Sequence, residues 1–92
     1  MSETFKMEVK VISIGDEQFF GNFKKRELIG LVDDDKYPTE YLFEFPQDKG
    51  DLLDKVKKGS TITIHFNIRC RKVESAVGED RYFTSLSAWR IE

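Results

Sequence analysis

The chain has little cysteine and histidine, and it has no excess of basic charge. Its 92 residues include one cysteine and one histidine, and 15 basic residues stand against 17 acidic ones, for a net charge of −2. A single cysteine excludes a disulfide within the chain and is compatible with a reducing compartment. The missing basic excess removes the simplest argument for a nucleic-acid partner. A local basic patch would suffice for one, because salt screens distant charges beyond about 8–10 Å.

Long apolar runs are also missing. No segment approaches the roughly 20 apolar residues of a membrane-spanning helix, and the opening stretch MSETFKMEVK has no apolar core of the kind found in signal peptides. We therefore expect a cytoplasmic protein that does not associate with a membrane. The length suits a single domain over residues 1–92.

The residue patterns of common catalytic and metal sites are absent as well. His65 has no cysteine or carboxylate at ligand spacing, and we find no Ser-His-Asp order, no glycine-rich phosphate loop and no paired catalytic carboxylates. The acidic run at 33–35 is typical of a solvated turn. We expect neither enzymatic activity nor a metal ion or cofactor.

Large aromatic residues and charged residues are what the chain has in abundance. Eight Phe, three Tyr and one Trp make up 13% of the sequence, and charged residues make up 35%. A disordered chain rarely carries so many large aromatic residues. We expect a compact domain with a small aromatic core and a heavily charged surface.

Alternation of apolar and polar residues predicts five strands, over 5–14, 23–32, 39–45, 60–73 and 81–92. A change to helical spacing predicts one helix over 48–59, and the segments 15–22 and 74–80 are expected to be loops. The apolar phase slips by one residue at Ile12, which predicts a bulge or sharp bend. Gly30, inside the second strand, predicts a second bulge or a close approach of two backbones. This order predicts an all-β OB-fold, a five-stranded Greek-key barrel with one short helix between strands three and four.

Four stretches of the sequence carry a resemblance to a known family. They are FKKREL, KYPTEYLFEF, KVKKGSTITIHFNI and DRYFTSLSAWRIE, and together they resemble a family of short bacterial and phage proteins long catalogued as a domain of unknown function. That family is similar to single-stranded DNA-binding proteins, so the resemblance, which covers roughly residues 7–92, implies an OB-fold and suggests the activity. The sequence departs from the family at Phe23, where many relatives have Trp, and in its Phe19-Phe20 pair.

The stretch EQFFGNFKKREL, residues 17–28, contains the first group of candidate binding residues. Strand alternation puts Phe23, Lys25 and Glu27 on one face, and Lys24, Arg26 and Leu28 on the other. If Leu28 belongs to the core, Phe23 points outward, where single strands usually lie on an OB-fold. Alternatively, Phe23 plugs the mouth of the barrel. The adjacent Phe19 and Phe20 indicate an interaction site, for bases or for a second subunit.

The two C-terminal strands contain the remaining candidates. Arg69 and Arg71 form either a track for phosphates or a solvated strand face, and Trp89 either stacks on a base or supports the sheet. Cys70 continues the apolar face of its strand, and we expect it to be buried and inert. The aromatic residues of the third strand, at 41, 43 and 45, are expected in the core.

These observations predict a protein that binds single-stranded nucleic acid, DNA in preference to RNA, without strong sequence preference, by base stacking and Lys/Arg phosphate contacts. The predicted binding residues are Phe20, Phe23, Lys24, Lys25, Arg26, Arg69, Arg71 and Trp89. One OB domain covers only about 4–16 nucleotides, which favours a homo-oligomer. The alternative is a protein-interaction OB module that acts as an oligomeric scaffold or as an accessory in DNA replication.

Overall fold

The computed structural model of the protein describes residues 4–33 and 36–92. Its elements are β1 (Phe5–Ile14), β2 (Gln18–Phe20), β3 (Phe23–Val32), β4 (Thr39–Pro46), η1 (Gln47–Lys55), β5 (Thr61–Val73) and β6 (Arg81–Ile91). The bounds of the five predicted strands agree with β1, β3, β4, β5 and β6 to within one residue. Positions 34 and 35 of the predicted acidic turn lie outside the described residues.

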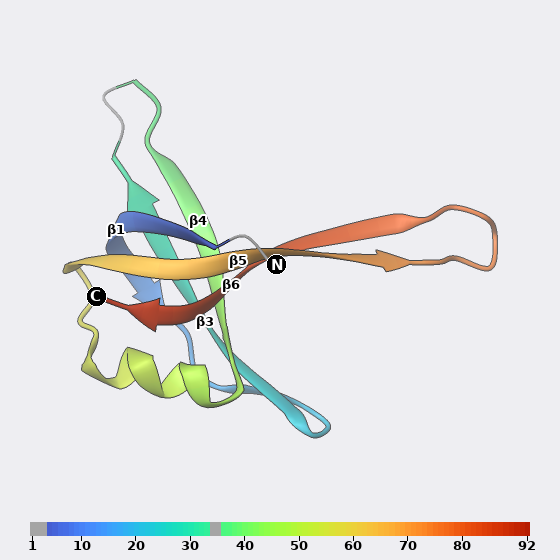
Figure 1. Cartoon of the computed structure of the whole chain (residues 1–92), viewed down its shortest axis with the longest axis horizontal. Helices are drawn as coiled ribbons and strands as arrows, with labels where there is room; N and C mark the ends of the chain where they lie inside the picture. Colours follow the sequence, from blue (N-terminus) through green and yellow to red (C-terminus); the bar gives the residue numbers. More distant parts are fainter. Residues whose placement is uncertain (1–3, 34–35) are drawn as a thin grey trace.

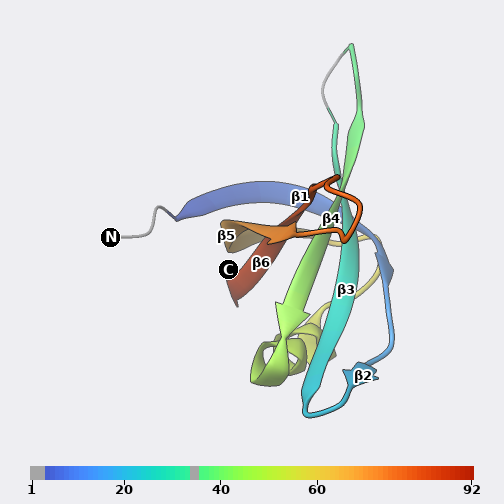
Figure 2. The ribbon, with the colours of Figure 1, turned by 90° about the vertical axis from the view of Figure 1, so that its right-hand side faces the viewer.

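The five long strands close into a barrel (Figures 1 and 2). The sheet order is β1-β5-β6-β4-β3-β2, and β1 pairs a second time with β3. The first half of β1 pairs with β5, and its second half pairs with β3 across a register shift between Val11 and Ser13. The predicted bulge at Ile12 is therefore confirmed, and it lets one strand serve both sides of the barrel. A short parallel pairing of β4 with β6 completes the closure. This is the predicted OB-fold.

The barrel interior holds an apolar core built from alternate residues of every long strand. The buried residues are Val9, Val11, Leu28, Phe43, Phe45, Leu53, Ile64, Phe66 and Ala88, with Tyr41 partly buried beside them. Gly30 is buried where β3 crosses β1, and a Cβ atom placed on it would lie 2.6 Å from Cγ2 of Val9. The close approach predicted at Gly30 is confirmed, since no side chain fits between the two strands there.

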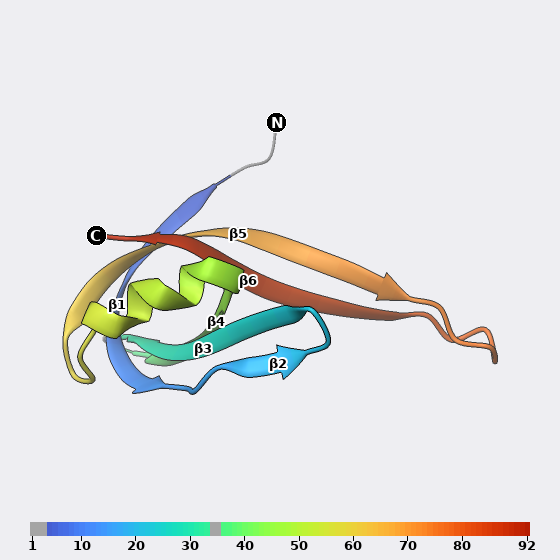
Figure 3. The same ribbon diagram turned by 90° about the horizontal axis from the view of Figure 1, so that it is seen from below.

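The helix η1 is shorter and tighter than the sequence predicts. It is a 3₁₀ helix that ends at Lys55, and Gly59 lies in the following turn with φ of +91°, donating its N–H to the Val11 carbonyl at 2.8 Å. Leu53 inserts into the barrel core, and Figure 3 shows η1 lying across one end of the barrel. The helix therefore closes that end and leaves the outer faces of the strands free.

Two regions differ from the sequence prediction. The expected loop 15–22 contains β2, which forms a tight hairpin with β3 through Gly21, whose φ is +62°. The last part of β5 and the first part of β6 extend well beyond the barrel as a two-stranded ribbon (Figure 1). We call this ribbon and its turn, residues 68–85, the arm. Cys70 lies on the arm and is exposed. The prediction that it is buried is wrong, because none of the described strands covers the arm where the apolar alternation continues.

Candidate nucleic-acid interface

Phe23 points away from the core. The β3–β4 register sets Leu28 directly opposite Phe43, and both side chains are fully buried. Phe23 lies five residues before Leu28, on the other face of the strand, and 40% of it is exposed. Lys25 shares the outer face with Phe23. Leu28 is therefore in the core and Phe23 points outward, which is the geometry that the sequence analysis required for a binding strand.

The hairpin of β2 and β3 adds a second aromatic ring to this outer face. Phe20 pairs directly with Phe23, so both rings are on the same side of the hairpin, and Phe20 is well exposed. The Lys25 ammonium lies 5.5 Å from the centroid of the Phe20 ring, within the range of a cation–π interaction. Phe19 pairs with Lys24 on the opposite side. Only one ring of the predicted Phe19-Phe20 pair thus joins Phe23.

A groove of about 550 Å³ lies between the outer face of the barrel and the arm. It is lined by Phe23, Lys25, Glu44, Arg71, Val73, Phe83, Thr84 and Ser85. We call it the arm groove. It brings Phe23 and Lys25 of β3 together with Arg71 of β5, although the two strands are distant in the sequence. It also includes Phe83, which the sequence analysis did not select. The signal that could have found it is the hairpin register, which pairs Phe83 directly with Arg71.

The charges on the two walls of the arm groove differ. On the barrel wall, the Lys25 ammonium lies 3.0 Å from a carboxylate oxygen of Glu44 and 4.0 Å from one of Glu27. Glu27 also accepts a hydrogen bond of 2.8 Å from the Gln18 side chain. On the arm wall, Arg71 forms no ion pair within the part of the chain that the structure describes. The arm wall therefore offers an uncompensated positive charge, and the barrel wall does not.

Lys24 and Arg26 lie outside the arm groove. Arg26 donates hydrogen bonds to the carbonyls of Gly15 and Gly50, at 3.1 and 3.2 Å, and to the Asp54 carboxylate at 3.0 Å. Because Gly50 and Asp54 belong to η1, this guanidinium fastens the helix to the barrel. Lys24 lies on the same side of β3 as Arg26 and pairs with Glu17 at 3.6 Å.

Arg69 and Trp89 are also placed apart from the groove lining. Arg69 is exposed on the same face of β5 as Arg71, two residues nearer the barrel. Trp89 occupies a bulge in β6, between residues paired with His65 and Phe66, and its ring centroid is 5.4 Å from that of His65. Trp89 is partly buried, and its indole N–H has no hydrogen-bond partner among the residues that the structure describes. Of the predicted binding residues, the arm groove thus brings together Phe23, Lys25 and Arg71, and Trp89 does not line it.

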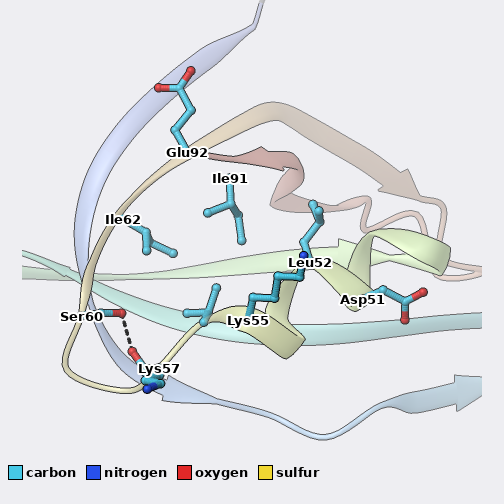
Figure 4. Close-up of a pocket in the computed structure, with 9 residues that line it drawn as sticks. Asp51, Leu52, Lys55, Lys57, Ser60, Ile62, Ile91 and Glu92 are labelled. Carbon is cyan, nitrogen blue, oxygen red and sulfur yellow. Dashed lines mark hydrogen bonds between the residues drawn. The ribbon is translucent and has the colours of Figure 1, made fainter.

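A second groove, of about 630 Å³, lies beside η1 (Figure 4). Its apolar lining residues are Leu52, Val56, Ile62 and Ile91, and charged side chains such as Lys55 and Glu92 lie at its rim. We call it the helix groove. It contains no aromatic residue, and none of the predicted binding residues lines it.

Two negative findings concern residues 4–33 and 36–92. No group of three or more His, Cys, Asp or Glu side chains is arranged to hold a metal ion. No helix in this part of the chain is long and apolar enough to cross a membrane.

The barrel closure and the position of η1 define an OB-fold protein, and known structures share this fold. The mitochondrial single-stranded DNA-binding protein Rim1 of S. cerevisiae superposes with a TM-score of 0.77 at 13% identity, covering 100% of this chain and 94% of Rim1. The SSB domain of a Synechococcus sp. protein superposes with a TM-score of 0.71 at 11% identity, covering 99% and 93%. These superpositions show a common fold, and at identities this low they show the fold alone.

The chain belongs to the family described as Domain of unknown function (DUF3127), whose model matches residues 6–92. This match confirms the resemblance to a domain of unknown function that the sequence motifs indicated. No curated protein matches the chain in sequence.

Proposed function

We propose that the protein binds single-stranded nucleic acid, DNA in the first place, in the arm groove and without catalysis. Bases stack on Phe23 and Phe83, with Phe20 extending the aromatic surface, and phosphates contact Arg71 and Arg69. One observation carries this proposal, namely that one groove is lined by two exposed Phe rings from separate strands and by an arginine that forms no ion pair with the described residues.

Stacking supplies most of the affinity in this proposal. A base stacked on an aromatic side chain contributes about 1–3 kcal/mol, more than an exposed charge pair, which contributes at most about 1 kcal/mol. The volume of the groove, about 550 Å³, lies within the range of typical small-ligand sites. Arg71 then adds a salt-dependent contact that does not depend on the base sequence.

Similarity of fold supports DNA as the ligand. Rim1, which superposes over the whole chain, is described as a mitochondrial single-stranded DNA-binding protein, and the Synechococcus match is described as an SSB domain. A homo-oligomer remains part of the proposal, since a single barrel covers only about 4–16 nucleotides.

Fluorescence anisotropy with labelled oligo-dT, at low and at moderate salt, tests the proposal. We expect binding that weakens with salt, with a log–log slope of about −0.7 for each phosphate contact. Phe23→Ala and Phe83→Ala should each weaken binding by about 1–3 kcal/mol. Tyr82→Ala is the matched control, because Tyr82 is equally exposed on the arm but lies on the face opposite Phe83.

Two outcomes would contradict the proposal. Absence of oligonucleotide binding at low salt would exclude single-strand binding. Equal affinity of wild type, Phe23→Ala and Phe83→Ala would exclude the arm groove as the stacking site, even if DNA bound elsewhere.

The helix groove favours the alternative function, a protein-interaction module. Its apolar walls and mixed charges suit a peptide segment better than a phosphate backbone. If the alternative is correct, oligo-dT will not bind at low salt, and a charge placed in the helix groove, as in Leu52→Asp, will release a protein partner. If the leading proposal is correct, Leu52→Asp will leave oligo-dT affinity unchanged.

A further inference from the structure

The ammonium group on the barrel wall of the arm groove, that of Lys25, is compensated by carboxylates. Glu27 and Glu44 face each other directly in the β3–β4 register, and Lys25 lies between them. Like charges at directly paired positions destabilise a sheet, so Lys25 is needed to hold the two carboxylates together. Lys25 is thus shared between Glu44, which lines the groove, and Glu27, which does not, and it offers no free positive charge to a ligand.

A phosphate group does not suit this wall. Lys25 is already engaged by Glu44 at 3.0 Å and by the Phe20 ring, and a phosphate beside it would face both carboxylates. Arg71, on the opposite wall, is free of ion pairs within the described part of the chain. A strand in the groove therefore lies with its phosphates toward Arg71 and with the base stacked on Phe23 toward β3 and β4.

This orientation presents the edge of a stacked base to Glu44. Glu44 lines the groove together with Phe23, whereas Glu27 does not. Lys25 donates to Oε1 of Glu44, and Oε2 accepts no hydrogen bond from any residue that the structure describes. The Glu44 side chain is about three-quarters buried, with 26% of it exposed. It thus offers a partly desolvated, charged acceptor beside a stacking ring.

We propose that Glu44 selects the base, by accepting a hydrogen bond from an exocyclic amino group. This inference rests on the proposed function and names the ligand class of the same site. Cytosine, adenine and guanine carry such a group, and a carboxylate is the usual acceptor for the amino group of cytosine. Thymine and uracil present keto oxygens at the corresponding positions, which a carboxylate repels. At the exocyclic position a keto base offers no donor, so a partly buried carboxylate that faces this position rather than the ring N3–H is left without a partner.

A comparison of oligo-dC with oligo-dU of equal length at pH 8 tests the inference, because the two bases differ in the amino or keto group and the adjacent ring nitrogen. We expect oligo-dC to bind about tenfold more tightly, which corresponds to about 1.4 kcal/mol. Glu44→Gln should reduce the preference to about twofold or less, because its amide can donate to the keto oxygen of uracil as well as accept from cytosine. Glu27→Gln is the matched control. It makes the same change of charge outside the groove lining, and it should keep the tenfold preference.

The outcomes separate this inference from the function on which it rests. Equal affinity for oligo-dC and oligo-dU in the wild type, or an unchanged preference in Glu44→Gln, overturns base selection and leaves single-strand binding intact. Failure of both oligonucleotides to bind at low salt overturns the proposed function and this inference together. Thermal unfolding of both variants checks that each is folded in the assay.

Discussion

The two halves of the β5–β6 hairpin have the same sequence pattern and opposite environments. In the half that belongs to the barrel, Ile64 is fully buried and Phe66 is 4% exposed. One alternation further along the same face of β5, Ile68 is 52% exposed on the arm. The change coincides with the end of the neighbouring strands, because the pairing of β1 with β5 stops at Phe66 and that of β4 with β6 stops at Leu86. Alternation therefore predicts a strand, whereas the neighbouring strands decide whether its apolar face is buried.

The same difference assigns the two halves different roles, since the buried half stabilises the fold and the exposed half carries proposed binding residues. An isolated two-stranded ribbon is at best marginally stable in water, so the arm depends on the strands that continue from it into the barrel. Segments with few buried contacts have low local stability, and binding residues are often found on them. Phe83 and Arg71 on the arm should accordingly matter little for folding and much for binding.

The largest expected contrast is between Phe43→Ala in the barrel and Phe83→Ala on the arm. Phe43 is fully buried and Phe83 is 56% exposed. Phe43→Ala should lower the free energy of unfolding by about 3–5 kcal/mol, and Phe83→Ala should change it by no more than about 0.5 kcal/mol. Urea unfolding followed by circular dichroism measures both values. A loss from Phe83→Ala as large as that from Phe43→Ala would mean that the arm is part of the cooperative core.

A smaller contrast is expected between two arginines. Arg26→Met removes three hydrogen bonds, two of which join β3 to η1, and it leaves the carbonyls of Gly15 and Gly50 without this donor. We expect a loss of about 1–3 kcal/mol in the free energy of unfolding. Arg71→Met, on the arm, should leave it within about 0.5 kcal/mol of wild type. Equal stability of the two variants in urea would show that Arg26 does not fasten the helix.

Much of the barrel could be predicted because its signals are local. The phase slip at Ile12 marked the bulge, and Gly30 marked the crossing of two strands. The position of Phe23 relative to Leu28 determined its direction once Leu28 was known to be buried. Each of these inferences needs only the order of residues within one strand and the rule that alternate side chains point to opposite faces.

The arm groove could be predicted only in part, because its chemistry depends on contacts between strands. Strand alternation predicts that Lys25 and Glu27 share an outer face, but only the β3–β4 register reveals Glu44 beside them. Arg26 looked like its neighbours in the basic run, yet it points to η1, whose position no local pattern gives. The length of the arm could not be predicted for the same reason, because an apolar alternation does not show where the neighbouring strands end.

The smallest expected effect concerns Cys70, the single cysteine of the chain, and it tests directly whether the arm is uncovered in solution. A maleimide should label Cys70 in the native protein at a rate close to that in urea, and the labelled protein should unfold at nearly the same urea concentration as the wild type. The matched barrel control is Ala88→Cys in a Cys70→Ser background, because Ala88 is on the buried face of β6. That thiol should react slower by orders of magnitude, since it becomes accessible only when the barrel opens. If Cys70 reacted as slowly as the control, another surface would have to cover the arm, and the contrast between the two halves of the hairpin would not hold in solution.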